Sequence, residues 1–284
     1  MKKHITLSII GLILGSSAQA QTPTQNLMPD GSRDMYWGLG VISRPQYEGA
    51  TSRKVAALPL LQMQWSNGLF VAGMGAGWHL SSQPKTDFGP MLLLDPGRSV
   101  TGTGNYIVFP LNTSSSLVSQ DKLEGPNRVR LTGLEEIHGR ILGGFFFNQE
   151  FGREWSQTNT LLMGAGNDRH GVKLNSEVRY LLSDLSSHHK LSLGIGVNVV
   201  NQSYARSFFG VTAAEAARST KPAFDPNAGV KDVYGELRWN WHFDANWMLT
   251  SKLHVGQFAG SVKNSPLVEQ KTTVTVSTAV AYRF

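Results

Sequence analysis

The chain has 284 residues, no cysteine, and only 16% charged residues, which is below the ~25% of an average soluble domain. The lack of cysteine excludes a disulfide scaffold. The sequence contains no run of about 18 apolar residues, so we expect no membrane-spanning helix. The formal net charge of +6 is spread along the sequence rather than gathered in a basic block, so we expect no nucleic-acid partner.

The start of the chain is typical of a secretory signal peptide. Lysines are followed by a short apolar stretch and by the small-residue cleavage motif Ala18-Gln19-Ala20. The apolar stretch is too short for the ~20 residues that a spanning helix needs. The sequence therefore predicts an exported protein whose residues 1–20 are a signal peptide.

Most of the remaining chain alternates between apolar side chains and polar or small ones. In one such segment, Val233 and Leu237 alternate with Glu236 and Arg238. Alternation with a period of two is typical of strands that have one apolar face. The segments are about as long as the ~9–11 residues of a tilted membrane strand. They are 35–43, 55–65, 69–80, 86–94, 136–148, 153–164, 171–182, 188–204, 231–243, 247–257 and 271–284.

These strands predict an all-β fold, a transmembrane antiparallel up-and-down β-barrel. An unpaired backbone group costs several kcal/mol in hydrocarbon, so a spanning sheet must close on itself. Eleven segments are visible, but two periplasmic termini require an even number. We expect about 12 strands, with 100–110 as the missing strand or with one segment between 55 and 94 misread, and keep ten as the alternative. The domains are then 1–20 signal peptide, 21–34 periplasmic segment and 35–284 barrel.

The connections divide into short turns and long loops. Asn67-Gly68 predicts a tight hairpin, and long loops at 44–53, 112–133, 206–230 and 258–270 are expected on the extracellular side. Within 206–230, Thr212 and Glu215 have the spacing of a capping box at the start of a short helix.

One face of the strands carries charged side chains that cannot face lipid cheaply. We expect them in the lumen, either as ion pairs that fill a narrow bore or as the lining of a pore for small solutes, and we favour ion pairs. The lumen-facing candidates are Lys173, Glu177, Arg179, Lys190, Asp232, Glu236, Arg238, Lys252 and His254.

The C-terminal strand places Val280, Tyr282 and Phe284 on one face. We expect them to be the signal that the barrel-assembly machinery reads. The sequence predicts no enzyme, because no Ser and His fall into a recognisable nucleophile motif. It predicts no metal site and no cofactor, because neither ligand spacings nor a phosphate loop is present.

Several motifs in order along the chain resemble the MipA/OmpV family. The motifs are Trp37–Gly40, Arg44–Gly49, Leu58–Leu61, Gly133-Leu134, Ser203–Ala214, Pro222–Asp225, Ala228–Val233, Ser265–Val268 and Ala281–Phe284. The segment 96–135 is longer than in the family pattern, which suggests an elaborated outer loop.

The resemblance implies a barrel in the outer membrane of a Gram-negative cell, in contact with lipid and lipopolysaccharide. It also implies a structural or scaffold role in murein (peptidoglycan) assembly or envelope stress, with a membrane-bound lytic transglycosylase and a murein synthase as partners. The alternative function is the narrow pore or transporter.

Overall fold

The computed structural model describes residues 33–81, 83, 85–103, 131–186 and 188–284. The expected signal peptide, and all but the last two residues of the expected periplasmic segment, lie outside these ranges. In the described part, no helix has the length and apolar composition needed to cross a membrane.

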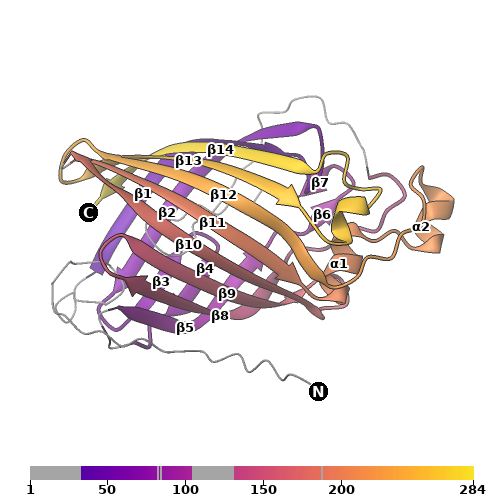
Figure 1. Cartoon of the computed structure of the whole chain (residues 1–284), viewed down its shortest axis with the longest axis horizontal. Coiled ribbons are helices and arrows are strands. Elements are labelled where there is room, and N and C mark those ends of the chain that lie inside the picture. The colour runs from indigo at the N-terminus through magenta and orange to yellow at the C-terminus, as the bar shows by residue number, and fades with distance from the viewer. Residues whose placement is uncertain (1–32, 82, 84, 104–130, 187) are drawn as a thin grey trace, which may run out of the picture.

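Twelve antiparallel strands form a closed barrel, as the sequence predicted (Figure 1). Each strand pairs with the neighbours that precede and follow it in the barrel, and β1 pairs with β14 from Tyr36 opposite Arg283 to Ser43 opposite Val276. The wall consists of β1 (Arg33–Pro45), β2 (Arg53–Trp65), β3 (Leu69–Ala72), β4 (Gly75–Trp78), β5 (Thr86–Asp95), β8 (Arg140–Phe151), β9 (Trp155–Ala165), β10 (Gly171–Ser186), β11 (His189–Val200), β12 (Gly229–His242), β13 (Trp247–Phe258) and β14 (Thr272–Arg283).

The outer face of the wall is apolar. Ile195 is 68% exposed and Ile141 is 66% exposed, values that water would penalise and that a lipid environment favours. Aromatic side chains gather at one end, where Trp247 and Tyr282 have ring centroids 5.0 Å apart. Such a girdle marks a membrane interface. The protein is therefore a transmembrane barrel of the outer-membrane type.

One predicted strand, 69–80, is two strands in the structure. A turn at Gly73 and Met74 separates β3 from β4, and Gly73 has a positive φ of 65°. This split supplies the twelfth strand. Of the two alternatives, a misread segment between 55 and 94 is therefore confirmed, and 100–110 does not complete the wall. Within 100–110, the described residues carry only β7 (Gly102–Thr103), which pairs with β6 (Arg98–Ser99) in a separate two-stranded sheet; residues 104–110 lie outside the described ranges.

The predicted strand 188–204 is also too long. β11 ends at Val200, and α1 (Gln202–Phe209) begins after Asn201. The Asn201 side chain accepts a hydrogen bond from the backbone N–H of Tyr204 at 2.9 Å, which caps the helix. The cap redirects the chain from the wall towards the mouth of the barrel.

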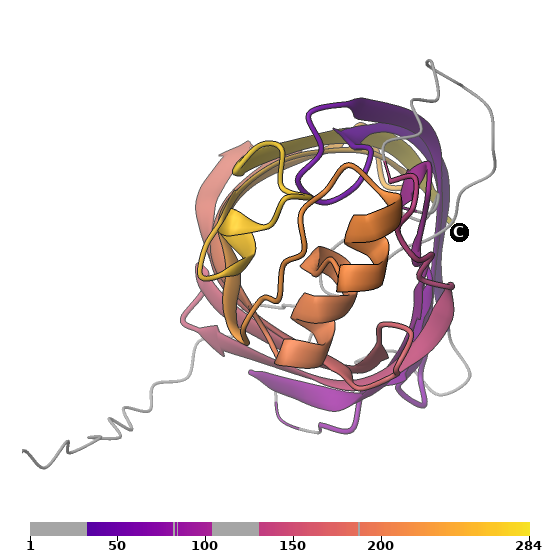
Figure 2. The same cartoon turned by 90° about the vertical axis from the view of Figure 1, so that its right-hand side faces the viewer.

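The mouth is covered by a plug, which we define as α1, α2 (Ala213–Arg218) and the short 3-10 helix η1 (Val262–Asn264). Figure 2 looks onto this end and shows the helices lying across the opening. The plug lies at the end opposite the C-terminus (Figure 1), so it covers the extracellular mouth if the termini are periplasmic. The predicted capping box of α2 is confirmed, with Thr212 and Glu215 bonded to each other's backbone N–H.

Candidate functional site

A cavity of about 530 Å³ lies in the bore between the plug and the half of the barrel that contains the C-terminus. β12 shows how the wall presents polar groups to it. Its outward side chains Val233 and Leu237 are 46% and 37% exposed, whereas the inward Glu236 and Arg238 are 3% and 2% exposed. The alternation that predicted the strand therefore also carries charge into the lumen.

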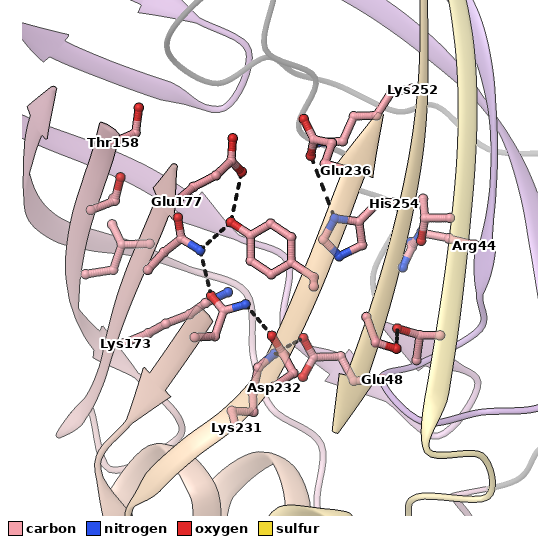
Figure 3. Close-up of a pocket in the computed structure, with 18 of the residues that line it drawn as sticks. Arg44, Glu48, Thr158, Lys173, Glu177, Lys231, Asp232, Glu236, Lys252 and His254 are labelled. Atoms are coloured by element: carbon pink, nitrogen blue, oxygen red, sulfur yellow. Dashed lines mark hydrogen bonds and ion pairs between the residues drawn. The ribbon is translucent and has the colours of Figure 1, made fainter. Parts of the chain in front are cut away.

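Glu236 is the centre of an ion-pair cluster in the cavity wall. The Oε1 atom lies 2.6 Å from Arg238 Nη2 and 3.6 Å from Arg179 Nη2. The Oε2 atom lies 2.5 Å from Lys252 Nζ and 3.7 Å from His254 Nδ1 (Figure 3). Three cations and a histidine thus share one carboxylate, which secures their positions.

A chain of hydrogen bonds leads from this cluster towards the plug. Tyr234 donates its hydroxyl to Glu177 Oε2 at 2.9 Å, and Glu177 also pairs with Arg179. Asn175 Nδ2 donates to the Tyr234 oxygen at 2.8 Å and to Asn198 Oδ1 at 3.1 Å. Asn198 in turn donates to an oxygen of Asp232 at 2.6 Å, as Figure 3 shows. The network therefore runs along the inner face of four neighbouring strands, β10 to β13, and ends near the plug at Asp232 of β12.

Lys231 completes the network because of a β-bulge. Asn198 lies opposite Asp232 and Val199 lies opposite Val230, so Lys231 is an extra residue in β12. A bulge turns a side chain out of the alternation, and Lys231 and Asp232 both point inward. Lys231 Nζ lies 3.0 Å from Asp232 Oδ2 and 2.7 Å from Glu48 Oε1 in the β1–β2 loop.

Contacts with buried groups hold the plug to the wall and to the neighbouring outer loops. Ser265 donates its hydroxyl to the Phe209 carbonyl at 2.6 Å, and Arg98 Nη1 donates to the Phe208 carbonyl at 2.6 Å. Phe209 is fully buried and packs edge-on against Phe258 of β13 with ring centroids 5.6 Å apart. These contacts make the plug part of the folded core.

Glu215 joins α2 of the plug to the loop that precedes β8. One oxygen accepts from the backbone N–H of Glu135 at 2.8 Å, and the other accepts from the N–H of Thr212 at 2.8 Å. Burial alone would raise the pKa of Glu215, but these N–H donors, the Thr212 hydroxyl and nearby Arg98 together hold the pKa below the usual glutamate value.

The sequence-based lumen candidates occupy two positions. One candidate, Lys190, is exposed and lies outside the cavity, opposite Asn240 and nearer the periplasmic end. The others line the cavity: Lys173, Glu177, Arg179, Asp232, Glu236, Arg238, Lys252 and His254.

Sequence reasoning missed several cavity residues. Arg44 and Glu48 come from the end of β1 and from the following loop, and no sequence signal places them in the bore. Lys231 was assigned no lumen role because strict alternation would place it on the outer face. The adjacent charges Lys231 and Asp232 were the available signal, since they cannot both face the lumen without a bulge.

A second buried polar pair lies in the half of the barrel away from the plug. His79 Nδ1 and Asp87 Oδ1 are 2.8 Å apart, and Asn148 Nδ2 donates to the other Asp87 oxygen at 3.3 Å. The ring of His79 packs against Phe70 and Phe146. In the described ranges, no three metal-ligating side chains gather closely enough to hold an ion.

At the C-terminus, Tyr282 and Phe284 lie on the outer face with ring centroids 5.1 Å apart, and Phe284 is 66% exposed. Val280 is half-buried on the same strand, opposite Leu39 of β1. The three predicted assembly residues therefore form an apolar row along the β1–β14 seam.

Comparison with known proteins agrees with the motifs. The chain is 29% identical over 281 residues to proteins named MltA-interacting protein from Escherichia coli (strain K12) and Shigella flexneri, covering 99% of each chain. Among solved structures, an outer membrane channel from Pseudomonas putida F1 is 12% identical, with 94% of this chain and all of that chain covered and a TM-score of 0.43. Residues 37–284 match the family model described as MltA-interacting protein MipA. The chain belongs to this family.

Proposed function

We propose that the protein is a closed outer-membrane barrel that serves as a scaffold for enzymes of murein assembly. The printed name of the Escherichia coli and Shigella flexneri relatives supports an interacting role. By the family resemblance, the partners are a membrane-bound lytic transglycosylase and a murein synthase. Contact with lipopolysaccharide and with the barrel-assembly machinery belongs to the same proposal.

The obstructed bore is the observation that carries the proposal. The plug packs into the mouth through Phe209 and Ser265, and the ion-pair cluster around Glu236 occupies the lumen below it. The plug and the ion-pair cluster narrow the bore, so we assign the activity to the rim and expect no conduction. Catalysis is not part of the proposal, since the relatives are named for an interaction and not for a reaction.

The periplasmic rim offers an exposed basic pair. Lys85 and Arg153 come from neighbouring turns, which are joined by a hydrogen bond from the Glu150 N–H to the Lys85 carbonyl at 2.9 Å. β1 begins with Arg33 at the same end, and the expected periplasmic segment precedes it in the sequence. We assign partner binding to the basic pair and to this segment.

Binding of the lytic transglycosylase MltA to the barrel in nanodiscs tests the scaffold. We expect the wild-type barrel to bind, and either the double variant Lys85→Glu/Arg153→Glu or deletion of residues 22–31 to weaken binding at least about tenfold. The matched control is Lys263→Glu/Lys271→Glu, which reverses two exposed lysines at the plug end. Failure of the wild-type barrel to bind would overturn the scaffold.

Single-channel recording tests the closed bore. We expect a refolded barrel, verified by heat-modifiable gel migration, to leave a planar bilayer silent. Steady ion-selective openings would instead support the alternative, a narrow pore for small solutes.

A further inference from the structure

We propose that the lumen cavity binds a small organic anion that carries hydroxyl groups, such as a sugar acid or a sugar phosphate. The site lies inside the bore, whereas the proposed murein enzymes would bind at the rim. The inference therefore goes beyond the scaffold function and can fail independently of it.

The first argument is the charge of the lining. Among the described residues, four carboxylates line the cavity, from Glu48, Glu177, Asp232 and Glu236. Six arginine and lysine side chains of the same ranges line it, from Arg44, Lys173, Arg179, Lys231, Arg238 and Lys252. A low-dielectric cavity with more cations than carboxylates attracts anions.

The excess is not neutralised by direct pairing. Glu236 is shared by three cations, and one of them, Arg179, also serves Glu177. Across the described part of the chain, no hydrogen bond or ion pair joins the side chain of Lys173 to another residue. Lys173 therefore adds positive charge to the lining that no described carboxylate contacts directly.

Arg238 provides a second, independent observation. Its side chain is 2% exposed, and only Nη2 is bonded to a carboxylate. Among the described residues, its Nε and Nη1 atoms have no hydrogen-bond acceptor. Buried guanidinium donors without acceptors are costly, so an added anion would be stabilised beside this residue.

The cavity leaves room for a ligand against the cluster. The side chains of Arg179, Lys252 and His254 keep 20%, 17% and 29% of their surface open. All three lie within ion-pair distance of the buried Glu236. The volume of about 530 Å³ falls within the roughly 300–1,000 Å³ of small-molecule sites.

Hydroxyl groups on the walls indicate what else the ligand carries. Thr158 and Thr160 lie on β9 and Thr275 lies on β14, and all three line the cavity. In the described ranges, no side-chain hydrogen bond engages any of these hydroxyls. Figure 3 shows Thr158 on the wall across from His254 and Arg44. An anion held by the cations can therefore direct its own hydroxyls towards threonines.

Calorimetry on the purified barrel in detergent at low salt tests the proposal with three probes. We expect glucose 6-phosphate to bind more tightly than inorganic phosphate, and glucose to give no measurable binding. Tighter binding of glucose 6-phosphate would assign the threonines a role, and equal binding of the two phosphates would remove that role. Equal binding of glucose, or no binding by any probe, would overturn the anion site.

Two variants with opposite effects identify the site. Arg238→Gln should weaken phosphate binding at least about tenfold, and Glu236→Gln should strengthen it because one competing carboxylate is lost. Lys190→Gln is the matched control, since Lys190 lies outside the cavity. If gel migration shows that Arg238→Gln does not fold, Lys252→Gln takes its place in the experiment. Unchanged affinity in the folded cavity variants would contradict the site.

Discussion

Lys231 Nζ lies 2.7 Å from Glu48 Oε1, although 183 positions separate the two residues in the sequence. The contact ties the outer end of β12 to the β1–β2 loop. The lysine side chain is only 3% exposed, so it depends on its carboxylate partners, and the bulge in β12 that turns it inward is a structural requirement.

Replacing this lysine should destabilise the barrel. Lys231→Met leaves Asp232 buried without its cation, and we expect the free energy of unfolding to fall by about 2 kcal/mol. This loss is smaller than for a fully buried ion pair because the second partner, Glu48, is 42% exposed. Urea unfolding followed by tryptophan fluorescence in lipid vesicles measures the change. Lys263→Met, at an exposed outer lysine, should shift it by less than about 0.5 kcal/mol; equal effects of both variants would refute the structural role of Lys231.

Close packing at the seam between β1 and β14 should make the stability of the barrel sensitive to substitution of Gly40. A Cβ at Gly40 would lie 2.4 Å from the Thr278 carbonyl oxygen and 2.3 Å from Ala279 Cβ. We expect Gly40→Ala to cost about 1–3 kcal/mol through overpacking. Gly143 is the matched control, because a Cβ there meets nothing within 4 Å, and Gly143→Ala should be neutral or slightly stabilising. The same urea titration compares them, and equal stability would contradict the packing.

The cap of α2 should control the rigidity of the plug. Thr212→Ala removes the acceptor for the Glu215 N–H, and we expect about 1 kcal/mol less local stability. Hydrogen exchange of 213–218 reports the loss as faster exchange. Thr212→Ser keeps a capping hydroxyl and should retain wild-type protection, so rapid exchange in both variants would argue against the cap.

Acid should loosen the same region. The pKa of Glu215 in the folded protein lies below its value in the unfolded chain, so its stabilisation is complete above the unfolded value of ~4.3 and is lost as the pH falls through the folded value. We expect protection of 212–218 to be constant between about pH 7 and 5 and to decrease below about pH 4. Glu215→Gln should lack this decrease; an identical acid response would assign it to other groups.

Phe284 should matter more for assembly than for stability. The ring is 66% exposed and contacts Tyr282 and Trp37 at centroid distances of 5.1 and 6.4 Å, so Phe284→Ala should cost at most about 1 kcal/mol. In cells we expect a clear loss of heat-modifiable barrel if this residue belongs to the assembly signal. Thr278→Ala on the same outer face serves as control, and normal assembly of Phe284→Ala would remove the residue from the signal.

Much of the wall could be predicted because lipid on one side and charge on the other impose a strict period of two. The same rule misled at two places. The alternation of Phe70, Ala72 and Met74 continues through the turn at Gly73, so two short strands read as one. Val199 and Val200 continue an apolar pattern up to Asn201, whose capping role depends on the backbone donor of Tyr204.

The cavity could be predicted only in part for a different reason. Strand alternation placed Glu236, Arg238 and Lys252 inward, but it cannot describe a bulge or a loop. Lys231 and Glu48 meet only after the barrel has closed and the loop has folded over it. Such contacts depend on tertiary structure, which a local period does not encode.

The pairing of β1 with β14 has a consequence for biogenesis. Each backbone hydrogen bond between β1 and β14 closes a loop that contains nearly the whole described chain. The entropy cost of closing that loop falls on the last step of strand pairing. A partly synthesised or truncated chain has two open strand edges and no way to shield them in lipid. Delivery to the membrane must therefore keep the polypeptide unpaired until its final strand has arrived.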